Sequence, residues 1–79
     1  AEARAALARS VEALRGLAAA HPGALEVERR LGTAVARSGD EARHDQRWSE
    51  AIAHYDEARA WIRRAAERDP DHAWTRRMV

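Results

Sequence analysis

Two proline-containing breaks constrain this chain more than any other feature of its sequence. They are Pro22-Gly23 and Asp69-Pro70-Asp71, and each stops a helix because proline lacks an amide proton and restricts the residue before it. Helix-forming residues fill the stretches between the breaks, with no run of β-branched or aromatic residues that would be typical of a strand. The sequence therefore predicts an all-α fold.

Apolar side chains recur at helical spacing within each stretch. We expect helices over residues 1–20, 24–45 and 47–68, and the start of a fourth helix after Pro70. One unbroken helix over 24–68 is the alternative, because the expected turn contains neither glycine nor proline. Such a helix would be far longer than is usual in globular proteins, so we favour a hairpin.

Large apolar side chains are scarce. Of the 79 residues, 20 are alanine and only 16 are larger apolar or aromatic residues, and a small domain with few of these is marginally stable. We therefore expect a slice of a longer protein, or a protomer completed by a partner. Small residues at Ala51, Ala58 and Ala65, and at Gly32 and Gly39, predict a close approach between helices.

The charge balance excludes some classes of function. Fourteen basic and thirteen acidic residues, interspersed along the chain, give a net charge of +1, whereas a nucleic-acid binder concentrates basic residues on one face. No apolar run is long enough to span a membrane. The absence of cysteine favours a cytoplasmic protein over a small extracellular one, and the use of arginine without lysine, with abundant alanine, indicates a bacterial source.

The chain also contains an internal repeat. Pro22 and Pro70 lie 48 residues apart, and at this offset the apolar stripes coincide, with Leu7 falling on Tyr55 and Leu14 on Ile62. A repeat of this length in a helical chain is typical of a stacked helical array.

At this point the sequence resembles the tetratricopeptide repeat. Gly39, Ala51, Tyr55 and Ala58 have the spacing of that family's small and aromatic positions, and Pro70 follows with a seven-residue extension of the helix. The resemblance implies antiparallel hairpins stacked as a short solenoid, with three long helices and the start of a fourth. It divides the single segment 1–79 into the second helix of one repeat, one complete repeat and the start of the next: 1–22, 23–70 and 71–79.

In the family that the chain resembles, the first helix of each repeat lines a concave binding groove. Carried over residue by residue, this implies a partner-binding face made by five residues: Thr33, Ala36, Asp40, Arg43 and His44. Ala36 and Asp40 replace the basic and amide groups with which family members clamp a carboxylate, so a partner of mixed charge is expected instead.

The three tryptophans have different expected roles. Trp48 and Trp74 lie on apolar stripes, and we expect them in the core. Trp61 stands one position off its stripe among arginines that include Arg64. Trp61 either packs against a neighbouring repeat or, with Arg64, anchors a partner, because Trp and Arg are enriched at binding hot spots.

Catalytic groups are not expected. The best candidate cluster is Glu41 and His44 on one helix with Glu50 and His54 on the next, a spacing used by carboxylate-bridged di-metal sites in helical bundles. Charged helices produce such pairs by chance, so a di-metal protein is a remote alternative and we expect neither cofactor nor enzymatic activity.

The function predicted from the sequence is therefore a non-catalytic interaction or scaffold module that binds a protein or peptide on its concave helical face. The alternative is self-assembly, in which the alanine faces and the stripe of 71–79 close against a second copy.

Overall fold

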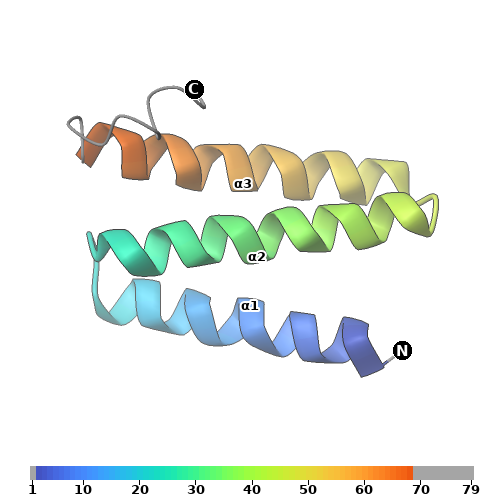
Figure 1. Ribbon diagram of the computed structural model, residues 1–79, viewed down its shortest axis with the longest axis horizontal. Helices are drawn as coiled ribbons and strands as arrows, with labels where there is room; N and C mark the ends of the chain where they lie inside the picture. The colour runs from blue at the N-terminus through green and yellow to red at the C-terminus, as the bar shows by residue number, and fades with distance from the viewer. Residues whose placement is uncertain (1, 69–79) are drawn as a thin grey trace.

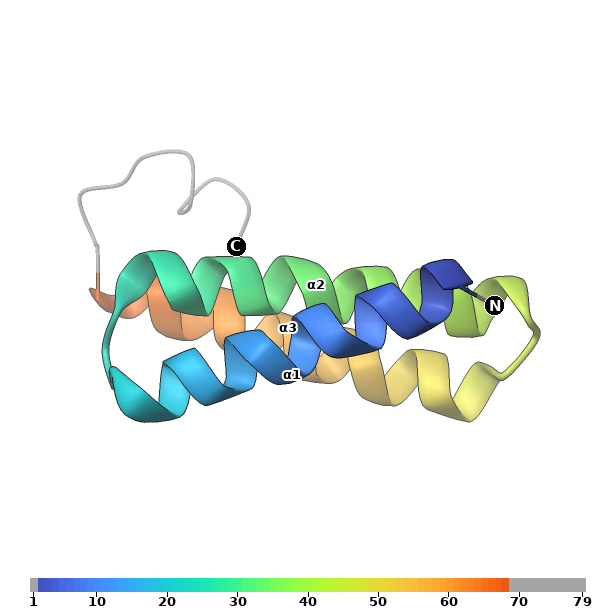
Figure 2. The ribbon, with the colours of Figure 1, turned by 90° about the horizontal axis from the view of Figure 1, so that it is seen from below.

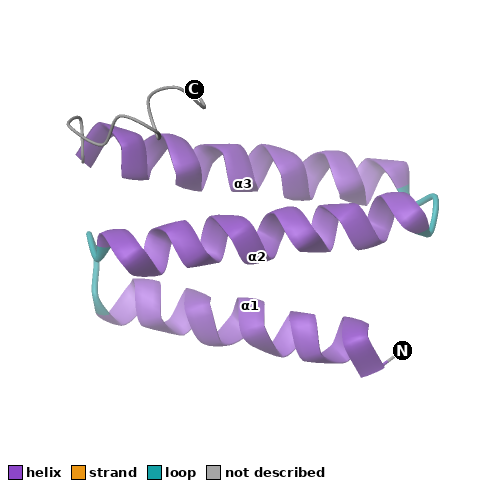
Figure 3. Ribbon diagram, in the orientation of Figure 1, coloured by secondary structure: helices purple, strands orange, loops and turns teal. Residues whose placement is uncertain are grey.

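The computed structural model describes residues 2–68, with side chains from Arg4 onward, as three helices joined by short turns (Figures 1 and 3). They are α1 (Glu2–Ala20), α2 (Leu25–His44) and α3 (Trp48–Arg68). The all-α prediction is confirmed for this part of the chain. The fourth helix predicted after Pro70, and Trp74 with it, lie outside the described residues.

The first turn forms where the proline break was expected. The His21 amide donates to the Leu17 carbonyl at 2.9 Å and closes the end of α1. Gly23 then adopts a φ of 86°, a left-handed conformation that glycine reaches without steric cost. Ala24 is extended and offers no side-chain cap to α2. The acidic Glu26 and Glu28 in the first turn of α2 complement its dipole instead.

The second turn decides between one long helix and a hairpin. The Asp45 amide donates to Glu41, and the Arg47 amide reaches back to the Ala42 carbonyl at 2.8 Å, as at a helix end closed by a left-handed residue. That residue is Gln46, with a φ of 63°, a conformation that costs a non-glycine residue about 1 kcal/mol. The predicted hairpin is confirmed.

The helices form one layer, with α2 between α1 and α3 (Figure 1). Neighbouring helices run antiparallel because each turn is short. Turned by 90°, the layer is bent, and over most of their length α1 and α3 lie on the same side of α2 (Figure 2). Two clefts lined by residues of all three helices lie on this side, and we call them together the trough, with α1 and α3 as its walls and α2 as its floor.

The core is small and is centred on α2. Leu31 and Val35 are the largest side chains that are fully buried. Around them the core is built from Val11 of α1, Ala34 of α2 and Ala58 of α3. A core with so few large side chains needs short distances between helices, because the dispersion attraction between atoms falls steeply with separation.

Small residues provide these short distances between α2 and α3. Ala51, Ala58 and Ala65, spaced by seven, are all buried. A Cβ atom on Gly32 would lie 3.2 Å from the Cβ of Trp61, and one on Gly39 would lie 2.8 Å from the ring of Tyr55. The close approach predicted from these alanines and glycines is confirmed.

The expectation that Trp48 belongs to the core is wrong. Trp48 is 58% exposed, and Ile52 on the same side of α3 is 61% exposed. Both lie on the predicted stripe, but they belong to its first two turns, and only the later members Tyr55 and Ile62 reach the glycines of α2. No helix in the described part of the chain has the length and apolar character needed to cross a membrane.

Substitution of two glycines tests the close packing. Gly16 in α1 has nothing within 4 Å of the place where a Cβ would stand, so Gly16→Ala should raise the free energy of unfolding by up to ~1 kcal/mol through helix propensity alone. Gly39→Ala gains the same propensity but must displace Tyr55, and overpacking costs about 1–3 kcal/mol. We expect a net loss of about 1 kcal/mol for Gly39→Ala.

Urea unfolding followed by circular dichroism measures both values. Equal stabilisation by the two substitutions would contradict the account of α2 and α3 packing.

Candidate functional site

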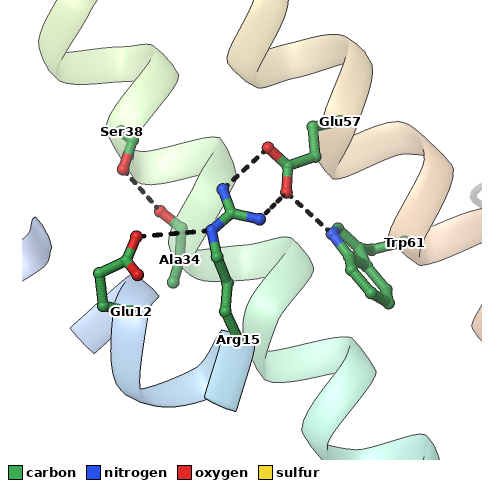
Figure 4. A network of polar contacts seen from close by, with 6 residues as sticks. All are labelled: Glu12, Arg15, Ala34, Ser38, Glu57 and Trp61. Atoms are coloured by element: carbon green, nitrogen blue, oxygen red, sulfur yellow. Dashed lines mark hydrogen bonds and ion pairs between the residues drawn. The ribbon is translucent and has the colours of Figure 1, made fainter. Parts of the chain in front are cut away.

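The trough is crossed by an ion pair that joins α1 to α3. Arg15 of α1 donates from both terminal nitrogens to the carboxylate of Glu57 on α3, with Nη2 3.0 Å from Oε1. Trp61 Nε1 donates to the same carboxylate at 3.1 Å (Figure 4). Glu12 lies one turn before Arg15 and forms a longer ion pair at 3.8 Å. The Arg15–Glu57 ion pair therefore spans the middle of the trough. Its two parallel hydrogen bonds are bidentate, which makes the interaction directional.

The ionisation of this pair follows from its hydrogen bonds. The guanidinium of Arg15, and after it the indole N–H of Trp61, lower the pKa of Glu57 despite partial burial. The same bond to Glu57 raises the pKa of Arg15. Both groups are charged around neutral pH, and each favours the charged form of the other.

A second charge cluster lies at the end of the trough nearest the first turn. The side chain of Glu28 is only 3% exposed; its Oε2 accepts a hydrogen bond from Arg68 at 2.5 Å and lies 3.7 Å from Arg64. Its Oε1 is buried and accepts no hydrogen bond from any residue that the structure describes. Arg64 also stands 4.8 Å from the centre of the Trp61 ring, a cation–π distance.

Trp61 and Arg64, for which anchoring a partner was one of two expected roles, lie together in the trough. Trp61 is half-buried against the core, and its indole N–H is occupied by Glu57. The contacts of Trp61 and Arg64 join α3 to α2 and to the Arg15–Glu57 pair. Their observed contacts are therefore within the chain.

Four of the other predicted residues are exposed on α2: Thr33, Asp40, Arg43 and His44. We call the surface that they share the outer face of α2. Ala36 is half-buried and packs against the core, so it contributes little to this face. The outer face and the Trp61–Arg64 pair are separate surfaces, and the structure does not bring the seven predicted residues together.

Hydrogen bonds tie the outer face to α3. The Tyr55 hydroxyl donates to Asp40 Oδ1, and Arg43 lies 3.9 Å from the same oxygen. The bond to Asp40 raises the pKa of Tyr55, because the carboxylate accepts from the protonated phenol. Thr33 donates its hydroxyl to the Arg29 carbonyl at 3.1 Å, which leaves its oxygen only as an acceptor.

Sequence reasoning missed the exposed pair Trp48 and Ile52 beside this face. Positions 48, 52 and 55 follow a helical spacing, so both side chains share the side of α3 on which Tyr55 meets Asp40. Because α2 and α3 are antiparallel and joined by a short turn, the start of α3 lies beside the end of α2. In the structure Trp48 is the first residue of α3, whereas the sequence predicted a helix that begins at residue 47.

The candidate metal ligands do not form a site. Among the described residues, no group of three or more His, Asp or Glu side chains could hold a metal ion. Glu41, Glu50 and His54 line one cleft between α1 and α3, whereas His44 is exposed on α2. Glu50 is paired with Arg47 at 2.5 Å.

Comparison of the chain with protein-family models, curated proteins and solved structures finds no match. The resemblance to the tetratricopeptide repeat therefore stays a prediction from the sequence.

The Arg15–Glu57 pair should make stability depend on pH. Because the folded pKa of Glu57 is lowered, its contribution is fully present above the ordinary glutamate pKa and disappears as pH falls through the lowered value. Glu57→Gln should reduce the free energy of unfolding by about 0.5–1 kcal/mol at neutral pH, the range for a partly exposed pair.

Chemical denaturation of the wild type and of Glu57→Gln at a series of pH values measures this difference, which should shrink toward acid. Glu67→Gln is the matched control, since Glu67 is exposed on α3 and forms no ion pair with another described residue. If the difference in unfolding free energy between the wild type and Glu57→Gln did not change with pH, the role assigned to the Arg15–Glu57 pair would be contradicted.

Proposed function

We propose that this chain is a non-catalytic interaction module that binds a protein or peptide across the outer face of α2 and the adjoining side of α3. The observation that carries the proposal is the exposure of Trp48 and Ile52, at 58% and 61%. Large apolar side chains on a surface gain free energy when a partner buries them.

The surroundings of this pair support a protein partner. Tyr55, Asp40 and Arg43 form a hydrogen-bonded and ion-paired group on the same side of the hairpin. A tryptophan and an isoleucine beside a tyrosine and an arginine match the composition of binding hot spots, where apolar anchors are surrounded by polar groups. His44 and Thr33 extend the polar part of the surface along α2.

The tetratricopeptide-like solenoid belongs to the same proposal. Two short antiparallel connections let α1 and α3 each pack against α2, as helices pack on their neighbours in solenoids, and the Arg15–Glu57 side-chain pair adds a contact between α1 and α3. We propose that the chain's binding takes place in the cytoplasm of a bacterium.

Self-assembly is the second candidate, because exposed large apolar residues occur on both outer helices. Leu17 on α1 is 45% exposed, and Trp48 and Ile52 on α3 are more so. Contact between the α1 side of one copy and the α3 side of the next would bury all three. Such a head-to-tail contact makes open assemblies unless its rotation closes a ring.

Photo-crosslinking tests the binding surface. A benzophenone side chain placed at His44 should capture a partner from an extract of the source cells, and unlabelled chain should compete with the capture. The double substitution Trp48→Ala with Ile52→Ala should reduce capture at least tenfold, because burying each side chain is worth roughly 1.5–3 kcal/mol.

Leu17→Ala is the matched control, since it removes an exposed apolar side chain from α1 and should leave capture unchanged. If Leu17→Ala and the double substitution reduce capture equally, the partner does not recognise the α2–α3 surface. If the captured protein is the chain itself, the self-assembly candidate replaces the proposal.

A further inference from the structure

A groove of about 370 Å³ runs between α1 and α2, on the side of the outer face where Thr33 lies. Its apolar lining comes from Leu7 and Leu14 of α1 with Ala34 of α2. Both leucines are only half-buried, so part of their surface faces the groove rather than the core. The groove therefore offers an apolar strip with nothing from the described chain covering it.

The charges of the groove are strongly unequal. Arg29, Arg30 and Arg37 line it on α2, against the single acidic residue Glu26, and Arg29 already has an interaction of its own. Glu26 is already paired with Arg30 at 3.0 Å. Arg37 is exposed and forms no ion pair with any described residue.

Arginine at such a place favours a carboxylate partner. Its planar fork can donate two parallel hydrogen bonds to a carboxylate, which gives directional recognition as well as charge attraction. No aromatic side chain lines the groove, so it lacks the stacking surface on which nucleobases are bound. The combination of a basic wall and an apolar strip fits a protein segment that is acidic and carries an apolar side chain.

We propose that the α1–α2 groove binds a short acidic segment of a partner protein, with an apolar side chain against Leu7 and Leu14 and a carboxylate on Arg37. This inference rests on the proposed function, since it assumes a protein partner, and it names the chemistry of that partner at one flank of the outer face. The proposed groove site does not include Trp48 or Ile52.

The probe is a fluorescein-labelled peptide of eight residues, six glutamates with two leucines four positions apart, titrated with the full chain by fluorescence anisotropy. Binding should weaken as salt is added, because screening reduces attraction between exposed charges. Arg37→Glu should weaken binding about fivefold, since an exposed ion pair is worth up to ~1 kcal/mol and reversal also adds repulsion.

Arg63→Glu is the matched control, because Arg63 is also exposed, lies on α3 and forms no ion pair with another described residue. It should change the affinity less than twofold. Two control peptides separate the parts of the proposal: glutamines in place of the glutamates should abolish binding, and serines in place of the leucines should weaken it several-fold.

Equal weakening by Arg37→Glu and Arg63→Glu would overturn the proposal, because it would show attraction to net charge alone. So would an unlabelled thymidine octanucleotide that displaces the peptide at equal concentration. If the wild type binds no peptide, the groove inference fails while capture dependent on Trp48 and Ile52 still stands. The double alanine variant of that pair should bind the peptide as the wild type does, and loss of peptide binding in this variant would overturn the placement of the peptide in the groove.

Discussion

Burial of Leu31 and Val35 in the middle of α2 is the interaction on which the rest of the structure depends. They are the largest fully buried side chains of the described chain, and every other member of the core contacts α2 from α1 or α3, or lies on α2 itself. Since neighbouring helices can gain stability only where they reach this strip, α2 must be the middle helix. The bent single layer follows from that constraint.

The two flanking helices meet α2 by different means. Helix α3 buries its alanines and packs Tyr55 and Trp61 onto the glycines of α2, so that the two helices approach closely and many weak contacts add up. Helix α1 contributes larger side chains, Val11 and Leu14 among them, and is also tied across the trough to α3 by Arg15 and Glu57. A partly exposed charge pair adds little stability, but it joins the two walls of the trough through two hydrogen bonds.

Because the core contains few large side chains, it also leaves some apolar surface uncovered. A core of this size cannot include Trp48 and Ile52, which lie beyond the reach of the α2 glycines. The half-buried Leu7 and Leu14 likewise remain partly open beside three arginines. The two proposed binding regions are thus the places where apolar side chains of α1 and α3 extend past the strip that α2 can cover.

Much of this fold could be predicted from the sequence, because its signals are local. The Pro22-Gly23 break ended α1 where expected, and the alanines spaced by seven correctly indicated close packing. The turn at Gln46 was harder to predict, because no glycine marks the position of the left-handed residue in the sequence. The exposure of Trp48 could not be predicted, because a helical stripe does not reveal which of its ends meets a partner. The Arg15–Glu57 bond, 42 residues apart in sequence, leaves no local pattern at all.

Native-state hydrogen exchange tests the central role of α2 most directly, because it measures the free energy at which each amide becomes open to solvent. The account predicts that amides around Leu31 and Val35 exchange only through global unfolding, and that the facing turns of α3 around Ala58 share this limit. Amides of α1 should exchange through a smaller opening that leaves the α2–α3 hairpin formed. Protection of α1 equal to that of α2, or exchange of Leu31 and Val35 before α1, would contradict it.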